Sequence, residues 1–359
     1  MGAETKIQWC HHTFNPWVGC AKVHAGCTHC YAEKSPAAKL RMGGSIEWGE
    51  VWQGGDRVVV ADSTWKQPLR WAQESARAGE RRRVFCASLA DVLEVPEMPP
   101  FERLTTALRD TVHHVRQQQE GARRRLWDVI RQTAELQPSV GSDQVVRWVP
   151  HDDPRNAWSR APGLDWLLLT KRPENWRLVP EDVRPLVWLG TSVSDQKTAD
   201  EWVPRLLEAQ GFRLRFLSVE PLLGPADLKR WMPWVFRKGV TKPFALPAEG
   251  GTRGVEWVIV GGESGPGARP CAVEWVSDVV RQCREAGVPC FVKQLGAVPV
   301  MSEVVWRARR PTLLLNAKNA RRAPDGTVPL YLSHAKGGSF LAEWPEDLRV
   351  RELPAGGAR

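Results

Sequence analysis

The chain has 359 residues, 42% of them hydrophobic and 25% charged, with a formal net charge of +9 at pH 7. This balance provides for a sizeable core and excludes a chain that is disordered throughout. No apolar run reaches about eighteen residues, and "MGAETKIQW" lacks the layout of a signal peptide, so we expect a cytoplasmic protein with no membrane partner. Eight cysteines in a reducing compartment indicate metal or redox chemistry before disulfides.

Three of these cysteines lie close together in "WVGCAKVHAGCTHCYAEK", at Cys20, Cys27 and Cys30. A structural zinc site normally has four ligands. The fourth would come from one of the nearby residues Cys10, His11, His12, His24 and His29. Three thiolates also suit a 4Fe–4S cluster whose remaining iron stays open to a substrate or cofactor. The spacing favours the iron–sulfur cluster and leaves zinc as the alternative.

Short apolar runs recur along the chain after a first strand expected at "NPWVGC", and each run ends in polar or glycine residues. They cover residues 83–88, 165–172, 186–193, 213–221, 257–265 and 290–296. Such nearly continuous apolar runs are typical of buried parallel strands. Helical patterns lie between several of them, as at 198–210 and 272–287. The alternation predicts an α/β fold, a complete or partial TIM-type (β/α) barrel.

The domain organisation follows from where this rhythm holds and where it breaks. We expect a barrel over residues 1–296, with a cluster-binding loop at 20–30, the cysteine loop. Two stretches rich in Pro, Gly and Trp, near 137–162 and 231–254, are predicted to be surface insertions. Residues 297–359 are predicted to form a small C-terminal appendage.

Function in a parallel barrel collects at the carboxyl ends of the strands. The candidate cofactor-binding residues at these ends are Ser88, Asp91, Thr170, Lys171, Ser192, Glu220, Gly261, Gly262 and Glu263. We expect them to line one pocket that faces the cysteine loop, and both signs of charge there suit a zwitterionic cofactor. The alternative is that Glu220 and Glu263 only pair with Lys171, Arg172 or Lys293 and close the barrel mouth.

The excess of positive charge lies partly in short arginine runs at 81–83, 123–125 and 307–310. A basic surface is typical of a nucleic-acid partner, because Lys and Arg contact phosphates and release counterions. The other interpretation is an ordinary solvated face.

Several motifs together resemble a phage-protein family of unknown function. They are "TFNPWVGCAKVHAGCTHCYAE", "LDWLLLTKRPENW", "RFLSVEPLLGP", "WVIVGGESGPGARP" and "VPCFVKQLG". Members of that family carry a three-cysteine motif likened to the radical SAM superfamily, and they are often encoded beside a three-Cys-motif partner protein. The resemblance implies a radical-SAM-like iron–sulfur protein of phage or prophage origin, with a 4Fe–4S cluster on Cys20, Cys27 and Cys30 and with S-adenosyl-L-methionine as a further cofactor.

The resemblance supplies no reaction, so whether the protein is an enzyme stays open. One hypothesis is a radical SAM enzyme that modifies or repairs nucleic acid or a nucleotide. The alternative is a non-catalytic nucleic-acid-binding protein stabilised by zinc or by a cluster.

The chain also departs from the radical SAM pattern in three ways. The usual C-x3-C-x2-C is C-x6-C-x2-C here, and His29 stands where an aromatic residue is usual. The Gly-Gly-Glu that usually ends the second strand ends the sixth predicted strand, at Gly261, Gly262 and Glu263. Cluster binding is therefore better supported by the sequence than SAM cleavage.

Overall fold

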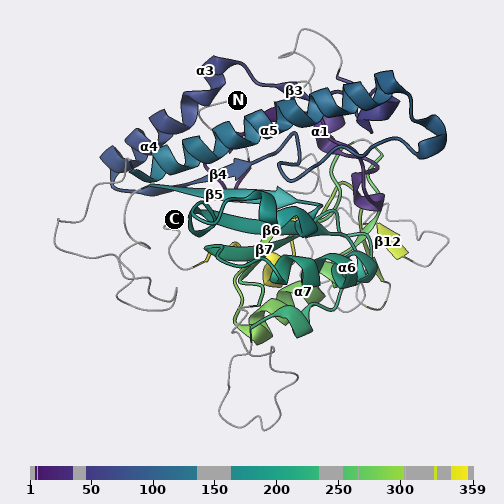
Figure 1. Ribbon diagram of the computed structural model, residues 1–359. Coiled ribbons are helices and arrows are strands. Elements are labelled where there is room, and N and C mark those ends of the chain that lie inside the picture. Colours follow the sequence, from purple (N-terminus) through teal and green to yellow (C-terminus); the bar gives the residue numbers. More distant parts are fainter. Residues whose placement is uncertain are drawn as a thin grey trace.

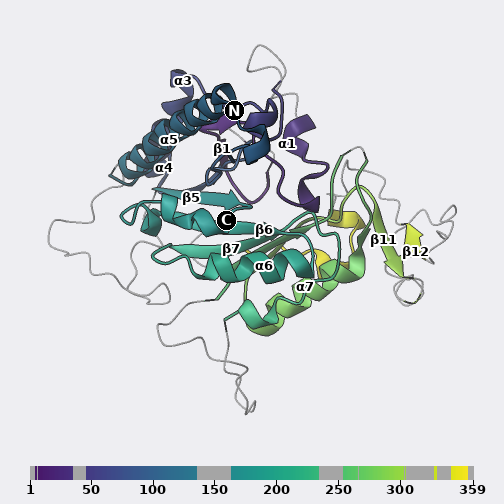
Figure 2. The ribbon, with the colours of Figure 1, turned by 45° about the vertical axis from the view of Figure 1, so that its right-hand side comes forward.

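The computed structural model describes residues 5, 7–34, 46–135, 163–233, 254–265, 267–302, 304, 327–329 and 341–354. Its centre is a curled sheet of seven strands whose neighbours all run parallel (Figures 1 and 2). In spatial order the strands are β1 (His12–Phe14), β4 (Arg81–Cys86), β5 (Gly163–Thr170), β6 (Val187–Val193), β7 (Leu214–Val219), β8 (Trp257–Gly261) and β10 (Cys290–Gln294). This order follows the chain, with β1 and β10 at the two edges, so the sheet is a half-barrel and confirms the partial TIM-type prediction.

The first strand lies earlier than the sequence pattern predicted, and that prediction was wrong. Strand β1 pairs His12–Phe14 with Val84–Cys86 of β4. The expected strand contains Pro16, which has no N–H to donate to a ladder. Beyond it, β2 (Trp17–Val18) pairs antiparallel with β3 (Val58–Val59) in a separate two-stranded sheet. Cys20 therefore follows β2 and not a strand of the half-barrel.

Helices cover the outer face of the sheet (Figures 1 and 2). They are α3 (Asp62–Trp65), α4 (Gln67–Ala78), α5 (Thr106–Glu135), α6 (Gln196–Leu207) and α7 (Val273–Ala286). The short helix α1 (Tyr31–Lys34) lies instead at the carboxyl ends of the strands, beside the three clustered cysteines. Helices α6 and α7 confirm the helices expected from the sequence. A capping box between Asp195 and Thr198 begins α6, and Gly287, with a positive φ of 69°, ends α7.

Short 3-10 helices make up the remaining helical turns. They are η1 (Ala25–Cys27), η2 (Val51–Gln53), η3 (Phe101–Arg103), η5 (Pro173–Leu178), η6 (Arg184–Leu186), η7 (Lys229–Trp231), η10 (Leu341–Glu343) and η11 (Glu346–Leu348). Between β5 and β6, the turns η5 and η6 occupy the place of the α-helix that a complete barrel unit would carry.

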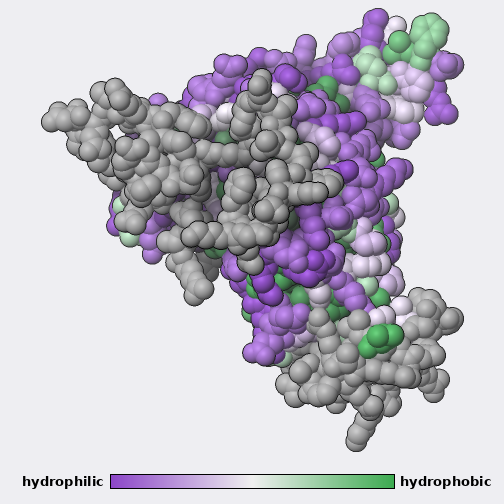
Figure 3. All heavy atoms as spheres, turned by 90° about the horizontal axis from the view of Figure 1, so that it is seen from below, coloured by the Kyte–Doolittle hydropathy of each residue, from purple (hydrophilic) through white to green (hydrophobic). Residues whose placement is uncertain are grey.

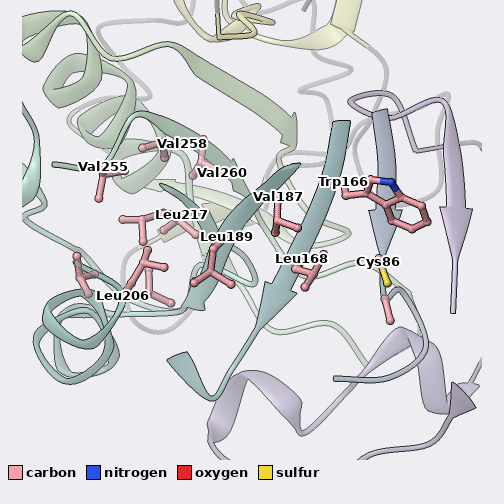
Figure 4. Packing of buried hydrophobic residues seen from close by; sticks show 14 of the residues in the cluster. Cys86, Trp166, Leu168, Val187, Leu189, Leu206, Leu217, Val255, Val258 and Val260 are labelled. Carbon is pink, nitrogen blue, oxygen red and sulfur yellow. The ribbon is translucent and has the colours of Figure 1, made fainter. Parts of the chain in front are cut away.

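Alternating side chains of the sheet form two apolar clusters, one on each face. On the outer face, Leu189 and Leu217 pack with Leu206 of α6 (Figure 4). On the inner face, Phe216 and Trp257 belong to a second cluster. Gly190 permits this inner packing, because a Cβ there would lie 2.4 Å from the Phe216 ring. Much of the described surface in the view from below is hydrophilic (Figure 3).

The C-terminal part packs on the β10 side of the half-barrel. Strand β11 (Pro299–Ser302) pairs with β9 (Cys271–Ala272) and β12 (Thr327–Pro329) in a three-stranded sheet. Trp344 and Leu348 join the outer cluster. The predicted insertion at 137–162 lies outside the described residues, as do most of the insertion predicted near 231–254 and the arginine run at 307–310. Among the described helices, none has the length and apolar character needed to cross a membrane.

Candidate metal centre

The three clustered cysteines line one cavity together with residues from the carboxyl ends of β4 and β5. The cavity has a water-accessible volume of about 110 Å³. Its lining includes Cys20, Cys27, Cys30, Tyr31, Trp48, Phe85, Ser88, Asp91, Leu169, Thr170, Lys171 and Arg172. The structure thus brings Ser88, Asp91, Thr170 and Lys171 together with the cysteines, while Ser192, Glu220 and the Gly-Gly-Glu stretch lie outside the lining.

Asp91 ties the end of β4 to the end of β5. Its carboxylate accepts hydrogen bonds from the Thr170 hydroxyl at 2.8 Å and from the Lys171 backbone N–H at 2.9 Å. The Arg172 guanidinium donates to it at 3.2 Å. These contacts make the Asp91 carboxylate part of the cavity wall. Its first role is therefore to hold the ends of β4 and β5 together.

Lys171 brings a positive charge to the cavity. Its ammonium donates to the Ser192 hydroxyl at 3.2 Å, and this contact connects the predicted residue Ser192 to the site although it lies outside the lining. Within the part of the chain that the structure describes, no carboxylate is paired with Lys171. An ammonium held by a neutral hydroxyl can take an anionic group of a bound molecule as its partner.

Tyr31 and Ser88 connect the cysteine loop to β4. The Tyr31 hydroxyl donates to the Ser88 carbonyl oxygen at 2.8 Å. The Ser88 hydroxyl accepts from the Asn15 side chain at 3.1 Å, and Asn15 in turn accepts from the Leu89 N–H. The end of the cysteine loop is therefore fixed against the first two strands of the half-barrel.

Glu94 is a site residue that the sequence analysis missed. Its buried carboxylate accepts from the Arg57 guanidinium at 2.6 and 2.8 Å and from the Ala21 backbone N–H at 2.7 Å. Gln119 of α5 donates to it at 3.1 Å and Arg172 at 3.3 Å. The signal in the sequence was a single acidic residue inside the otherwise apolar stretch "VLEVP".

Arg172 joins the two carboxylates of this region to the cysteine loop. It contacts both Asp91 and Glu94, and it also donates to the Ala21 carbonyl oxygen at 3.1 Å. Burial lowers the pKa of Arg172, but the nearby Asp91 and Glu94 carboxylates raise it by more than burial lowers it. The net shift is upward, so the guanidinium stays charged. Burial, followed by the Glu94 and Asp91 carboxylates, raises the pKa of the Cys20 thiol well above its ordinary value.

Glu263 contacts the cysteine loop from the opposite side, at the end of β8. Its carboxylate accepts from the Arg269 guanidinium at 2.6 and 2.9 Å and lies 3.1 Å from His29 Nδ1. Arg269 also donates to the Ala25 carbonyl oxygen at 2.8 Å. Burial raises the pKa of Glu263, but hydrogen bonds from Arg269 and His29 lower it to about 2, so the carboxylate is charged at neutral pH.

Glu220 pairs with Lys293. This is one of the ion pairs expected if the strand-end carboxylates only close the barrel mouth. The Lys293 ammonium donates to the Glu220 carboxylate at 2.5 Å, and the Gln294 amide donates at 3.1 Å. Gly262 packs against the end of β10, where a Cβ would lie 2.5 Å from the Leu295 carbonyl oxygen. This close approach accounts for a glycine at Gly262 without a bound cofactor.

The cysteine donor set suits a cluster. All eight cysteines of the described residues are free thiols. The described part of the chain contains no group of three or more His, Cys, Asp or Glu side chains arranged to hold one metal ion. A 4Fe–4S cluster takes one thiolate at each of several irons, so its ligands are spread around the cluster. Three free cysteines around a cavity fit that requirement.

Comparisons with known proteins place the chain in a family without assigning a reaction. Residues 4–159 and 142–328 match the family described as "Protein of unknown function (DUF5131)". None of the curated proteins matches the chain. One solved structure that is similar, a mutant of spore photoproduct lyase, has 10% sequence identity and a TM-score of 0.36, over 92% of this chain and 71% of that chain. A likeness of this size carries no functional inference.

Proposed function

The chain belongs to the DUF5131 family of proteins of unknown function, and we propose that it is a radical-SAM-like iron–sulfur protein in which Cys20, Cys27 and Cys30 hold a 4Fe–4S cluster. The observation that carries the proposal is the shared cavity, which brings these three cysteines to the carboxyl ends of β4 and β5. When bound, a cluster with three thiolate ligands supplies one-electron chemistry and an open iron where a cofactor can coordinate.

The other residues of the cavity would bind and orient a cofactor beside that cluster. Lys171 offers an ammonium for a carboxylate, and the Thr170 to Arg172 segment is held in place by Asp91. S-adenosyl-L-methionine, which carries both an ammonium and a carboxylate, is the cofactor we propose. Glu263 is engaged by Arg269, so a cofactor amine would have to displace that guanidinium to reach it.

The test of the cysteine ligands is replacement of each one in turn. Cys20→Ala, Cys27→Ala and Cys30→Ala should each abolish iron loading in anaerobic reconstitution, because a three-thiolate cluster cannot spare a ligand. Cys86→Ala and Cys290→Ala are the matched controls, since both side chains are buried in the outer core and neither lines the cavity. Full iron loading in Cys27→Ala would contradict the assignment.

Cofactor binding is tested on the reconstituted protein. Adding S-adenosyl-L-methionine should change the electron paramagnetic resonance spectrum of the reduced cluster if its open iron accepts the cofactor. An unchanged spectrum at saturating cofactor would contradict the cofactor proposal without contradicting the cluster assignment. The same sample, analysed for S-adenosyl-L-methionine cleavage, tells an enzyme from a non-catalytic protein.

A nucleic-acid or nucleotide substrate remains a prediction from charge, and two of the three arginine runs contribute less to it than expected. Arg81 forms a buried ion pair with Asp165, and Arg83 donates to the Trp9 carbonyl oxygen. Arg123 donates to the Glu94 carbonyl oxygen. These arginines stabilise the fold instead of presenting their charge to phosphates. Binding to DNA or RNA that weakens steeply with salt would support the prediction.

The phage origin and the three-Cys-motif partner protein rest on the motif resemblance alone. The alternative function, a zinc-stabilised nucleic-acid-binding protein, would be favoured by one tightly bound zinc and no iron.

A further inference from the structure

The carboxylate of Glu94 lies behind the cysteine loop and does not line the cavity. Its side chain is 1% exposed and that of Arg57 is 0% exposed. The groups that donate to it come from four separate parts of the chain: the cysteine loop, the segment before β3, helix α5 and the end of β5. A buried charge of this kind costs several kcal/mol unless its partners are held in good geometry.

Ala21, directly after Cys20, is held at both of its backbone polar groups. Its N–H donates to Glu94 Oε1 at 2.7 Å, and its carbonyl oxygen accepts from Arg172 at 3.1 Å. Arg172 in turn contacts Glu94. Glu94 therefore fixes the peptide that follows Cys20 directly through the N–H and indirectly through Arg172.

We propose that Glu94 is the positioning residue of the cysteine loop. Its carboxylate, held by Arg57, fixes Ala21 and thereby sets the direction of the Cys20 side chain before any metal is bound. The proposal rests on the proposed function in one respect only, that Cys20 is a cluster ligand. The positioning of Ala21 itself can be measured on the metal-free protein.

A second buried ion pair in the same half-barrel provides a matched control. Arg81 and Asp165 pair at 2.7 Å, with side chains 4% and 1% exposed. This pair lies at the start of β4 and β5, whereas Cys20 lies beyond the other ends of those strands. Glu94→Gln and Asp165→Asn each remove one buried negative charge with little change in shape, so both should lower stability.

The experiment compares these two variants with the unaltered chain in two measurements. The first is hydrogen exchange of the Ala21 amide in the metal-free protein, which Glu94→Gln should speed by about 10-fold or more as local opening becomes easier. The second is iron retention against a chelator after anaerobic reconstitution, which Glu94→Gln should weaken by about 10- to 100-fold, as changes behind metal ligands typically do. Asp165→Asn should leave both measurements within about twofold.

Each outcome decides something. Unchanged exchange at Ala21 in Glu94→Gln overturns the proposal, and so does an equal effect from Asp165→Asn, which would show only lost stability. If the unaltered chain holds no iron, the cluster proposal fails while the exchange measurement still tests the positioning role. Should Glu94→Gln fail to fold, Arg57→Lys keeps the charge but loses the two-pronged contact, and it should raise exchange at Ala21 in the same direction.

Discussion

Two groups of charged residues hold the cysteine loop, one at its start and one near its end. The buried clasp consists of Glu94, Arg57 and Arg172 and acts on Ala21. The rim clasp consists of Glu263, Arg269 and His29, and Arg269 acts on Ala25. In the buried clasp both a carboxylate and a guanidinium contact the loop backbone. In the rim clasp the guanidinium contacts the backbone and the carboxylate contacts the His29 side chain.

The two clasps differ in their exposure to water. In the buried clasp the Arg57 and Glu94 side chains are 0% and 1% exposed. In the rim clasp Glu263 is also buried, at 5% exposed, but its partners Arg269 and His29 are 28% and 30% exposed. Removing one member of a pair in which both side chains are buried leaves an uncompensated charge. In the rim clasp the partners of Glu263 are partly exposed, so water can enter where one of them is removed. The same chemistry is therefore expected to fix the loop firmly beside Cys20 and to hold it only loosely near Cys27 and Cys30.

The largest expected difference is between Arg57→Ala and Arg269→Ala. Arg57→Ala leaves Glu94 buried without its closest cation and should cost about 3–5 kcal/mol of unfolding free energy. Arg269→Ala should cost less, about 1–2 kcal/mol, because Glu263 keeps its His29 contact and water can enter where the partly exposed Arg269 is removed. Urea denaturation of both variants measures the difference. Equal losses would contradict the contrast between the clasps.

A second test concerns the glycine beside the rim clasp. Gly262→Ala should destabilise the fold by about 1–3 kcal/mol through overpacking, because the new Cβ would lie 2.5 Å from Leu295 O and 2.9 Å from Cys271 Cβ. Gly121→Ala is the control, since a Cβ there meets no atom within 4 Å and the position is in helix α5. This control should be neutral or stabilising by up to about 1 kcal/mol. Little loss in Gly262→Ala would mean that the packing explanation of this glycine is wrong.

The last test concerns pH at the rim clasp. The pKa of Glu263 is about 2 in the folded protein, against an ordinary value of 4.5. Its charge therefore stabilises the fold above pH 4.5, and this contribution is lost as the pH falls from about 4.5 towards 2. Glu263→Gln should be less stable than the unaltered chain at pH 6, and the difference should shrink between pH 4.5 and 2. A difference that stays constant over that range would contradict the pKa assignment.

The sequence predicted the parts of the fold that have a periodic signal. Six strands of the half-barrel and two helices were found because apolar runs of strand length alternate with amphipathic stretches. Strand β1 was misplaced because it has only three residues, too few to show a pattern, and because the more apolar Trp17 and Val18 stand just after it. Barrel geometry alone was also enough to predict that Ser88, Asp91, Thr170 and Lys171 lie close together.

The pairing of charges could not be predicted in the same way. Glu94 meets an arginine 37 positions earlier and a glutamine 25 positions later, a spacing with no periodicity. Glu263 pairs with Arg269 and His29 and not with the strand-end cations that the sequence offered. Net charge gave a similarly incomplete picture, because it cannot tell a buried arginine such as Arg81 from one at the surface.

Iron and sulfide analysis of the anaerobically reconstituted protein is the most direct test of the central claim, that the three cysteines around the cavity hold a 4Fe–4S cluster. The account predicts about four irons and four sulfides per chain and an electron paramagnetic resonance signal on reduction. Both should be lost in Cys20→Ala, Cys27→Ala and Cys30→Ala. One zinc per chain with no iron or sulfide after reconstitution would contradict it.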